Sequence, residues 1–149
     1  MAVRIQPEAF DIGAEIGRLT AGRTEIGAVV TFTGLCRADG ETGVISAMEL
    51  EHFPGMAEEE LSRIEAEARA RWPLIDSLIV HRYGRLVPGD PIVLVVTLSA
   101  HRQAAFEAAN FLMDYLKTSA PFWKKEENAR GAEWVAAKGS DDEARDRWR

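Results

Sequence analysis

The chain has 149 residues, of which 46% are hydrophobic and 28% are charged, as expected for one compact domain with its own core. Disorder, collagen and a coiled coil are therefore poor interpretations. Asp and Glu number 24 against 18 for Lys and Arg, so the net charge is −6 and we expect no non-specific binding of nucleic acid.

The cysteine content and the apolar runs favour a cytoplasmic protein. The single cysteine, Cys36, cannot form an internal disulfide or a multi-cysteine metal site, and it suits a reducing compartment. Residues 1–19 contain scattered acidic side chains and no unbroken apolar stretch, so they do not resemble a signal peptide. The most apolar run, residues 91–100, is far shorter than the ~20 residues of a membrane span, and we expect no membrane association.

The first third of the chain predicts a helix and two strands. Pro7 stands at a typical first helical position, and apolar residues then recur at helical spacing as far as Leu19. Segments 26–32 and 44–53 are rich in β-forming residues. Because turn residues lie between these two segments, we expect them to pair as an antiparallel hairpin.

Helices and strands alternate in the next part of the chain. Apolar residues spaced three and four apart predict a helix over 56–71. Segments 77–83 and 91–98 predict two strands, the second apolar enough to be central in a sheet. A third helix is predicted over 100–118.

These elements predict a single α+β domain with antiparallel sheets packed by about three helices. Residues 122–135 predict loop and short strand. The following segment, 138–149, is nearly all polar, so we expect a loose tail after a domain that spans 1–137.

The start of the third helix breaks a local rule. His101 and Arg102 lie where free backbone N–H groups already create a positive potential, which is unfavourable unless an anion lies nearby. An anionic ligand is one interpretation. Equally, Ser99 caps the helix and both basic side chains point into solvent.

Three lysines flank a proline-aromatic stretch near the end of the domain. A lysine held close to another cation has a lowered pKa and can act as acid, base or nucleophile near neutral pH. Lys117 has an alternative role, because a lysine in a last helical turn complements the helix dipole. Lys124 and Lys125 are consecutive, so in an extended segment only one of them enters a given pocket.

The remaining candidates lie in the strands and the first turn. Arg37 follows a strand, where a guanidinium can clamp a phosphate or carboxylate with two hydrogen bonds. Its neighbour Cys36 is more simply explained as a small buried hydrophobe. His52 and His81 have no partners at metal-ligand spacing, so we interpret them as core or interface histidines and expect no metal site.

Several long sequence blocks, taken together and in order, carry a resemblance that covers residues 3–135. The chain resembles the large catalytic subunits of molybdopterin synthase, the MoaE family. The blocks that match are residues 27–37, 50–57, 71–74, 79–82 with 89–90, 99–102 and 111–126.

This resemblance implies an α/β-hammerhead type of α+β fold and a sulfurtransferase activity in molybdenum cofactor biosynthesis. Such an enzyme converts cyclic pyranopterin monophosphate to molybdopterin by inserting two dithiolene sulfurs. A small ubiquitin-like subunit supplies the sulfur as a thiocarboxylate on its C-terminal Gly-Gly tail. A homodimer of large subunits lies at the centre of a heterotetramer, and no cofactor is implied.

The resemblance also implies the residues of the site. Lys117 is expected to be the main catalytic group, with Lys124 assisting it. The residues expected to bind the substrate are Leu35, Cys36, Arg37, His101, Arg102, Lys117, Lys124, Lys125 and Glu126.

Two other functions are compatible with these residues. A non-catalytic module could hold a phosphorylated small molecule with Arg37, His101 and Arg102. A single-stranded nucleic-acid binder could use the run Trp123-Lys124-Lys125, although the net charge of −6 opposes that interpretation.

Overall fold

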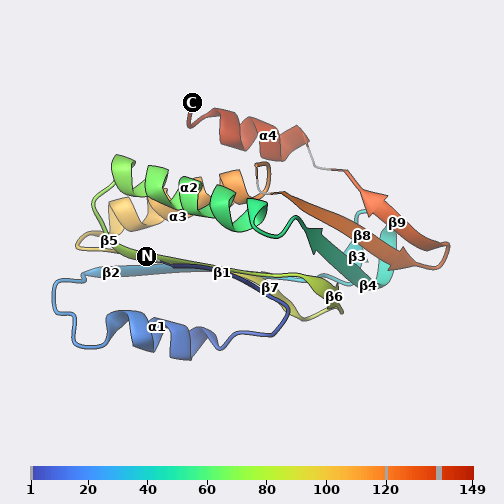
Figure 1. Cartoon of the computed structure of the whole chain (residues 1–149), viewed down its shortest axis with the longest axis horizontal. Helices are drawn as coiled ribbons and strands as arrows, with labels where there is room; N and C mark the ends of the chain where they lie inside the picture. Colours follow the sequence, from blue (N-terminus) through green and yellow to red (C-terminus); the bar gives the residue numbers. More distant parts are fainter. Residues whose placement is uncertain (1, 120, 137–138) are drawn as a thin grey trace.

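The protein is described by a computed structural model that covers residues 2–119, 121–136 and 139–149 (Figure 1). A four-stranded sheet has the order β1-β5-β7-β2, with β1 at Ala2–Gln6, β5 at Leu74–Arg82, β7 at Pro91–Ser99 and β2 at Ala28–Leu35. A five-stranded sheet contains β3 (Asp39–Gly40), β4 (Gly43–His52), β8 (Phe122–Asn128) and β9 (Gly131–Val135) in that order, and β6 (Gly84–Leu86) also pairs with β4.

Helices cover both faces of the four-stranded sheet. Figure 1 shows α2 (Met56–Arg71) and α3 (Arg102–Leu116) on one face and α1 (Ile12–Thr20) on the other. Each face of this sheet has its own hydrophobic core, and successive side chains of β7 enter the two cores in turn. Val93 and Val95 pack under α2 and α3, whereas Leu94 and Val96 pack towards α1. β7 is therefore central in its sheet, as its apolar run predicts, and it is buried from Val93 to Ser99.

The α+β class is confirmed, and one strand pair differs from the expected antiparallel pattern. β1 pairs with β5 in parallel. Every other strand pair of the described residues is antiparallel. No helix in the described part of the chain is long and apolar enough to cross a membrane.

Local signals predicted the helices well. Helix α2 has the predicted bounds, and α3 is shorter at both ends than the predicted 100–118. Helix α1 begins at Ile12, later than expected, because the Asp11 side chain accepts a hydrogen bond from the Ala14 N–H at 3.0 Å and caps the helix there.

The predicted hairpin between 26–32 and 44–53 is wrong. Strand β2 pairs with β7, and β4 pairs with β8 in the other sheet. The turn residues form a much smaller hairpin, in which two-residue β3 pairs with the start of β4. The chain thus crosses from one sheet to the other between Leu35 and Asp39.

The polar C-terminal segment, for which the sequence predicts a loose tail, has regular structure near its start and ring contacts near its end. It contains α4 (Gly139–Asp146), and Trp148 then packs edge-on against Trp72 and Phe111. The Trp148 indole N–H donates to Asp114 at 2.6 Å, and Arg147 forms an ion pair with the same carboxylate. The expected boundary at residues 137 and 138 lies outside the described residues.

Candidate active site

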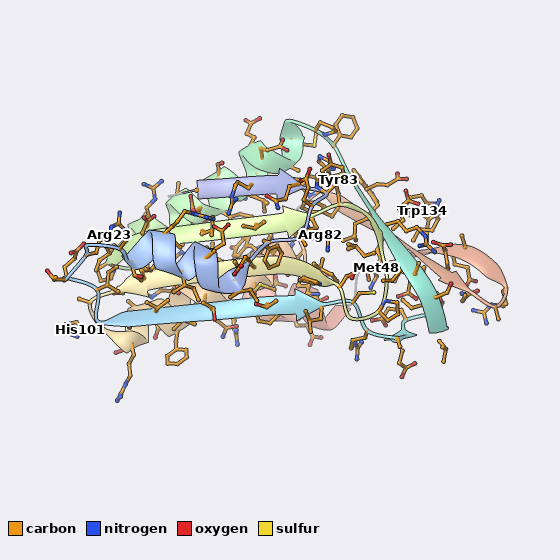
Figure 2. All side chains as sticks on the ribbon, turned by 90° about the horizontal axis from the view of Figure 1, so that it is seen from below. Arg23, Met48, Arg82, Tyr83, His101 and Trp134 are labelled. Atoms are coloured by element: carbon orange, nitrogen blue, oxygen red, sulfur yellow. The ribbon has the colours of Figure 1, made fainter. Side chains whose placement is uncertain are left out.

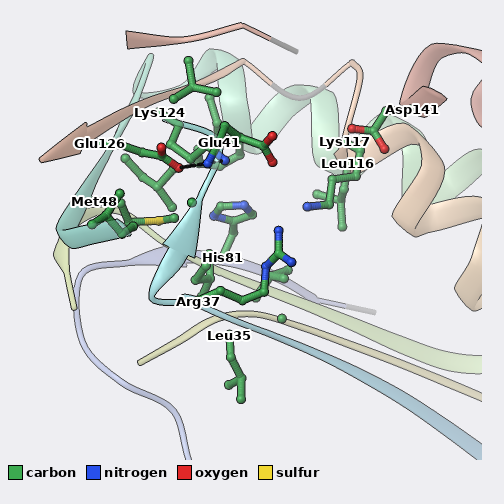
Figure 3. Close-up of a pocket in the computed structure, with 18 of the residues that line it drawn as sticks. Leu35, Arg37, Glu41, Met48, His81, Leu116, Lys117, Lys124, Glu126 and Asp141 are labelled. Carbon is green, nitrogen blue, oxygen red and sulfur yellow. Dashed lines mark hydrogen bonds and ion pairs between the residues drawn. The ribbon is translucent and has the colours of Figure 1, made fainter. Parts of the chain in front are cut away.

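A pocket of about 330 Å³ lies where the two sheets meet the C-terminal end of α3 (Figure 3). Its wall includes the end of β2, the β3 segment, the inner faces of β4 and β8, and Asp141 of α4 (Gly139–Asp146). Five residues expected in the site line it: Leu35, Arg37, Lys117, Lys124 and Glu126.

Three cations reach this pocket from three different elements. Arg37 comes from the loop after β2, Lys117 caps the C-terminus of α3, and Lys124 lies on β8. Figure 3 shows the Arg37 guanidinium and the Lys117 ammonium pointing into the same space. The wall also contains the carboxylates of Asp39, Glu41, Glu126 and Asp141. The point where the three basic side chains converge favours an anionic group of a ligand.

Glu126 is the buried counter-charge of the cluster, with 1% of its surface exposed. Its carboxylate accepts hydrogen bonds from the Thr42 N–H at 2.8 Å, the Thr42 hydroxyl at 2.9 Å and the Glu41 N–H at 3.1 Å. Lys124 Nζ lies 3.8 Å from Glu126 Oε2. Burial alone would raise the pKa of Glu126, but the hydrogen bonds from Thr42 and Glu41 and the charge of Lys124 outweigh it and lower this pKa.

Gly40 lets the β3 segment approach that carboxylate. A Cβ atom at residue 40 would lie 2.6 Å from Glu126 Oε2, closer than van der Waals contact allows. The turn residues at this position thus serve the site and not a long hairpin.

His81 also lines the pocket, although the sequence suggested only a core or interface role. It lies at the end of β5, is 8% exposed and stacks on Phe122 with ring centroids 3.8 Å apart. Burial lowers the pKa of His81 to about 4, and the nearby charges of Lys117 and His52 act in the same direction, while a hydrogen bond with the Arg82 carbonyl opposes the shift. Its strand pattern, with apolar neighbours in sequence, gave no signal of this position.

Cys36 and Lys125 do not line the pocket. Cys36 is buried in the small core beside β4, where burial, the largest effect, and the charges of Asp90 and Glu126 raise the pKa of its thiol. The Cys36 backbone N–H donates a hydrogen bond to the Asp90 carbonyl, and the Cys36 carbonyl accepts one from the Gly89 N–H. Both backbone groups are thus used within the protein. Lys125 points to the opposite face of β8 from Lys124 and lies 4.9 Å from the centre of the Trp134 ring.

This alternation along β8 also bears on the nucleic-acid interpretation. Trp123 is exposed, Lys124 enters the pocket and Lys125 covers Trp134. Consecutive residues of a strand point to opposite faces, so the run 123–125 does not present one continuous basic surface.

His101 and Arg102 lie at the other end of the domain from the pocket. The pocket is at the Pro91 end of β7, whereas His101 follows the Ser99 end (Figure 2). Helix α3, whose 15 residues span about 22 Å, separates Arg102 from Lys117. His101 is the helix N-cap and forms no side-chain capping bond, and Ser99 donates to the Pro73 carbonyl instead of capping α3.

The fold and the pocket define an α+β domain with a pocket between its two sheets, into which three basic side chains converge. The MoaE protein family matches residues 5–119. The chain is 61% identical to the molybdopterin synthase catalytic subunit of Mesorhizobium japonicum, covering 99% of this chain and 92% of that one. It is 55% identical to the molybdopterin synthase catalytic subunit of Pseudomonas aeruginosa, with 99% of each chain covered.

Solved structures agree with this similarity. The MoaE protein from Burkholderia ambifaria superposes with a TM-score of 0.85 at 52% identity, covering 99% of this chain and 98% of that chain. Molybdopterin synthase from Staphylococcus aureus superposes with a TM-score of 0.81 at 33% identity, covering 89% and 96%. The chain belongs to the MoaE family.

Proposed function

We propose that this chain is the catalytic subunit of a molybdopterin synthase, a cytoplasmic sulfurtransferase. Its pocket binds cyclic pyranopterin monophosphate, and the reaction inserts two dithiolene sulfurs to form molybdopterin. The observation that carries the proposal is the convergence of Arg37, Lys117 and Lys124 on one pocket, in a chain whose relatives have this name.

Each cation has a role that follows from its position. Arg37, at the mouth formed by the end of β2, clamps the phosphate with its planar guanidinium. Lys117 protonates the leaving oxygen or stabilises the negative charge that develops as the thiocarboxylate attacks. Lys124 assists, and Glu126 holds the Lys124 ammonium in place through their ion pair.

The sulfur donor is a separate chain. With Cys36 as its one cysteine, this chain has no second thiol with which to relay sulfur internally. The proposed donor is a small ubiquitin-like subunit whose C-terminal Gly-Gly thiocarboxylate enters the pocket. One such subunit at each end of a homodimer gives a heterotetramer.

His101 and Arg102 reach a substrate in this pocket only from a second copy of the chain. Strand β2 is an edge strand of its sheet, and it exposes Val29, Phe32 and Leu35. An exposed apolar edge strand is a template for pairing with another strand. If two β2 strands pair antiparallel across a two-fold axis, the Leu35 end of one lies beside the Ala28 end of the other, where Arg102 follows Ser99.

The direct test combines three purified components: this chain, a thiocarboxylated small subunit and cyclic pyranopterin monophosphate. The expected result is molybdopterin, detected as its fluorescent oxidised derivative. A stable complex with the small subunit that binds the pterin and forms no product would favour the non-catalytic binding module.

A further inference from the structure

His81 is a polar residue at a buried position, where an apolar side chain would be less costly to bury. Along β5, Leu78 and Val80 point towards α1, whereas Ile79 and His81 point towards α3. Burying a polar ring without a hydrogen-bond partner costs ~1–3 kcal/mol. A nearly buried imidazole beside a ligand pocket therefore indicates a use for its nitrogen atoms.

Two contacts fix the His81 ring. Nδ1 lies 2.8 Å from the Arg82 carbonyl oxygen. A carbonyl can only accept, so Nδ1 carries the hydrogen, and in the neutral ring Nε2 then has a free lone pair. The ring also stacks on Phe122 with an interplanar angle of 15°. Neither tautomer nor orientation is free to change without losing one of these contacts.

Nε2 has no hydrogen-bond partner among the residues that the structure describes. Figure 3 places the His81 ring between the Lys124–Glu126 pair and the side chains of Arg37 and Lys117. Those three cations can only donate hydrogen bonds, and the Glu126 carboxylate already accepts from Thr42 and Glu41. The carboxylates of Asp39, Glu41 and Asp141 also line the pocket, so His81 provides a neutral acceptor in a wall whose other side-chain acceptors are charged.

We propose that His81 is a substrate-binding residue whose Nε2 accepts a hydrogen bond from an N–H or O–H group of the ligand. The ligand class is a small molecule with an anionic group for the cations and a neutral donor for His81. A phosphorylated pterin has both, so this inference rests on the proposed function and assigns it a further contact. Because the pKa of His81 is about 4, the acceptor persists at neutral pH.

The kinetic test compares His81→Phe with His52→Phe in the reconstituted reaction. Phe keeps a flat ring for stacking on Phe122 and removes the acceptor. We expect His81→Phe to raise KM for cyclic pyranopterin monophosphate about 10- to 100-fold with kcat changed less, because the ligand donor is left unpaired. The His52 ring also stacks on Phe122, with ring centroids 6.0 Å apart, but His52 is not among the residues that line the pocket. The KM of His52→Phe should therefore stay within about two-fold of the wild-type value.

His81→Gln separates hydrogen bonding from structure. A glutamine side-chain oxygen can replace the Nε2 acceptor without a ring, so it should recover part of the KM lost in His81→Phe. Equal KM values for His81→Phe and wild type would overturn the inference and leave the enzyme assignment intact. A wild-type chain without turnover would instead contradict the proposed function.

A spectroscopic measurement on the wild-type protein does not depend on any variant folding. The chain has three histidines, so ¹⁵N-labelled imidazole signals are few enough to assign. We expect one Nε2 signal to remain that of an unprotonated nitrogen across about pH 5.5–7.5, where ordinary histidines titrate, and to shift when the pterin is added. A His81 signal that titrates in this range, or that does not move with saturating pterin, would contradict the proposal.

Discussion

Lys117 lies at the junction between the C-terminus of α3 and the pocket. Its backbone N–H closes the last helical turn through a hydrogen bond to the Met113 carbonyl at 3.1 Å, so the helix fixes where the side chain starts. The residue is exposed, and its ammonium points into the pocket (Figure 3). The Lys117 side chain can therefore be removed without disturbing the helix that positions it.

Replacing Lys117 by Ala should lower kcat about 10²- to 10⁴-fold, because the group that donates a proton or stabilises charge is lost. The free energy of unfolding should change by no more than ~0.5 kcal/mol, as for other exposed residues. Arg69→Ala is the matched control, since Arg69 is an exposed basic residue at the C-terminal end of α2, as Lys117 is at that of α3. Normal turnover by Lys117→Ala would remove Lys117 from the mechanism.

Ionisation of Glu126 makes the free energy of unfolding depend on pH. Its pKa is lower in the folded protein than its usual value of 4.5, so ionised Glu126 stabilises the fold above that pH. This contribution is lost as pH falls through the folded pKa. Glu126→Gln should lower the free energy of unfolding at pH 7 by ~1–3 kcal/mol, since an amide NH₂ group would face N–H donors.

Urea unfolding of wild type and Glu126→Gln across the acidic range measures this effect. The difference between the two proteins should be constant at neutral pH and shrink below the usual glutamate pKa. A difference that grows as pH falls would have the wrong sign for a lowered pKa.

At the scale of elements, periodicity and local chemistry predicted what depends on neighbours in sequence. Helix α2 has the predicted bounds because its apolar stripe and the stop at Trp72-Pro73 are local signals. The wrong β2–β4 hairpin came from turn residues that belong to two-residue β3. The parallel β1–β5 pair went unpredicted, since pairing with distant strands leaves little trace in a local pattern. The β8–β9 hairpin is local, but its polar and charged residues gave only a prediction of loop and short strand.

Gly40 tests the role of the β3 segment. Gly40→Ala should push the Glu126 carboxylate away from the Thr42 and Glu41 N–H groups and lower both thermal stability and turnover, because a Cβ has no space there. In Gly17→Ala, the matched control in α1, a Cβ meets nothing within 4 Å, so stability should be unchanged or rise by up to ~1 kcal/mol. Equal thermal midpoints for Gly40→Ala and wild type would show that Glu126 can move at no cost.

At the scale of the whole molecule, the fold unites residues that are far apart in sequence. Arg37, Lys117, Lys124 and Glu126 were expected in one site from the family resemblance, and the two sheets bring them to one pocket. His101 and Arg102 were expected there as well, but α3 keeps them one helix length away. Nothing local in a sequence distinguishes a residue that acts within its own chain from one that acts in a neighbouring copy.

Mixing inactive variants tests whether two copies share a site. Lys117→Ala and Arg102→Ala chains, unfolded together and refolded at equal amounts, should recover about a quarter of wild-type activity. Half of the randomly formed dimers are mixed, and each of these has one complete pocket of two. No recovery, with both variants folded and dimeric, would mean that Lys117 and Arg102 do not serve one pocket from two chains.

The most direct measurement of the central claim follows the sulfur itself. The small subunit is prepared with an isotopically labelled thiocarboxylate and mixed with this chain and cyclic pyranopterin monophosphate, and the product is analysed by mass spectrometry. The account predicts product with two labelled sulfurs per molecule, formed at least about 10²-fold more slowly when Lys117→Ala replaces the wild-type chain. Pterin that binds in the pocket and is recovered without labelled sulfur would contradict it.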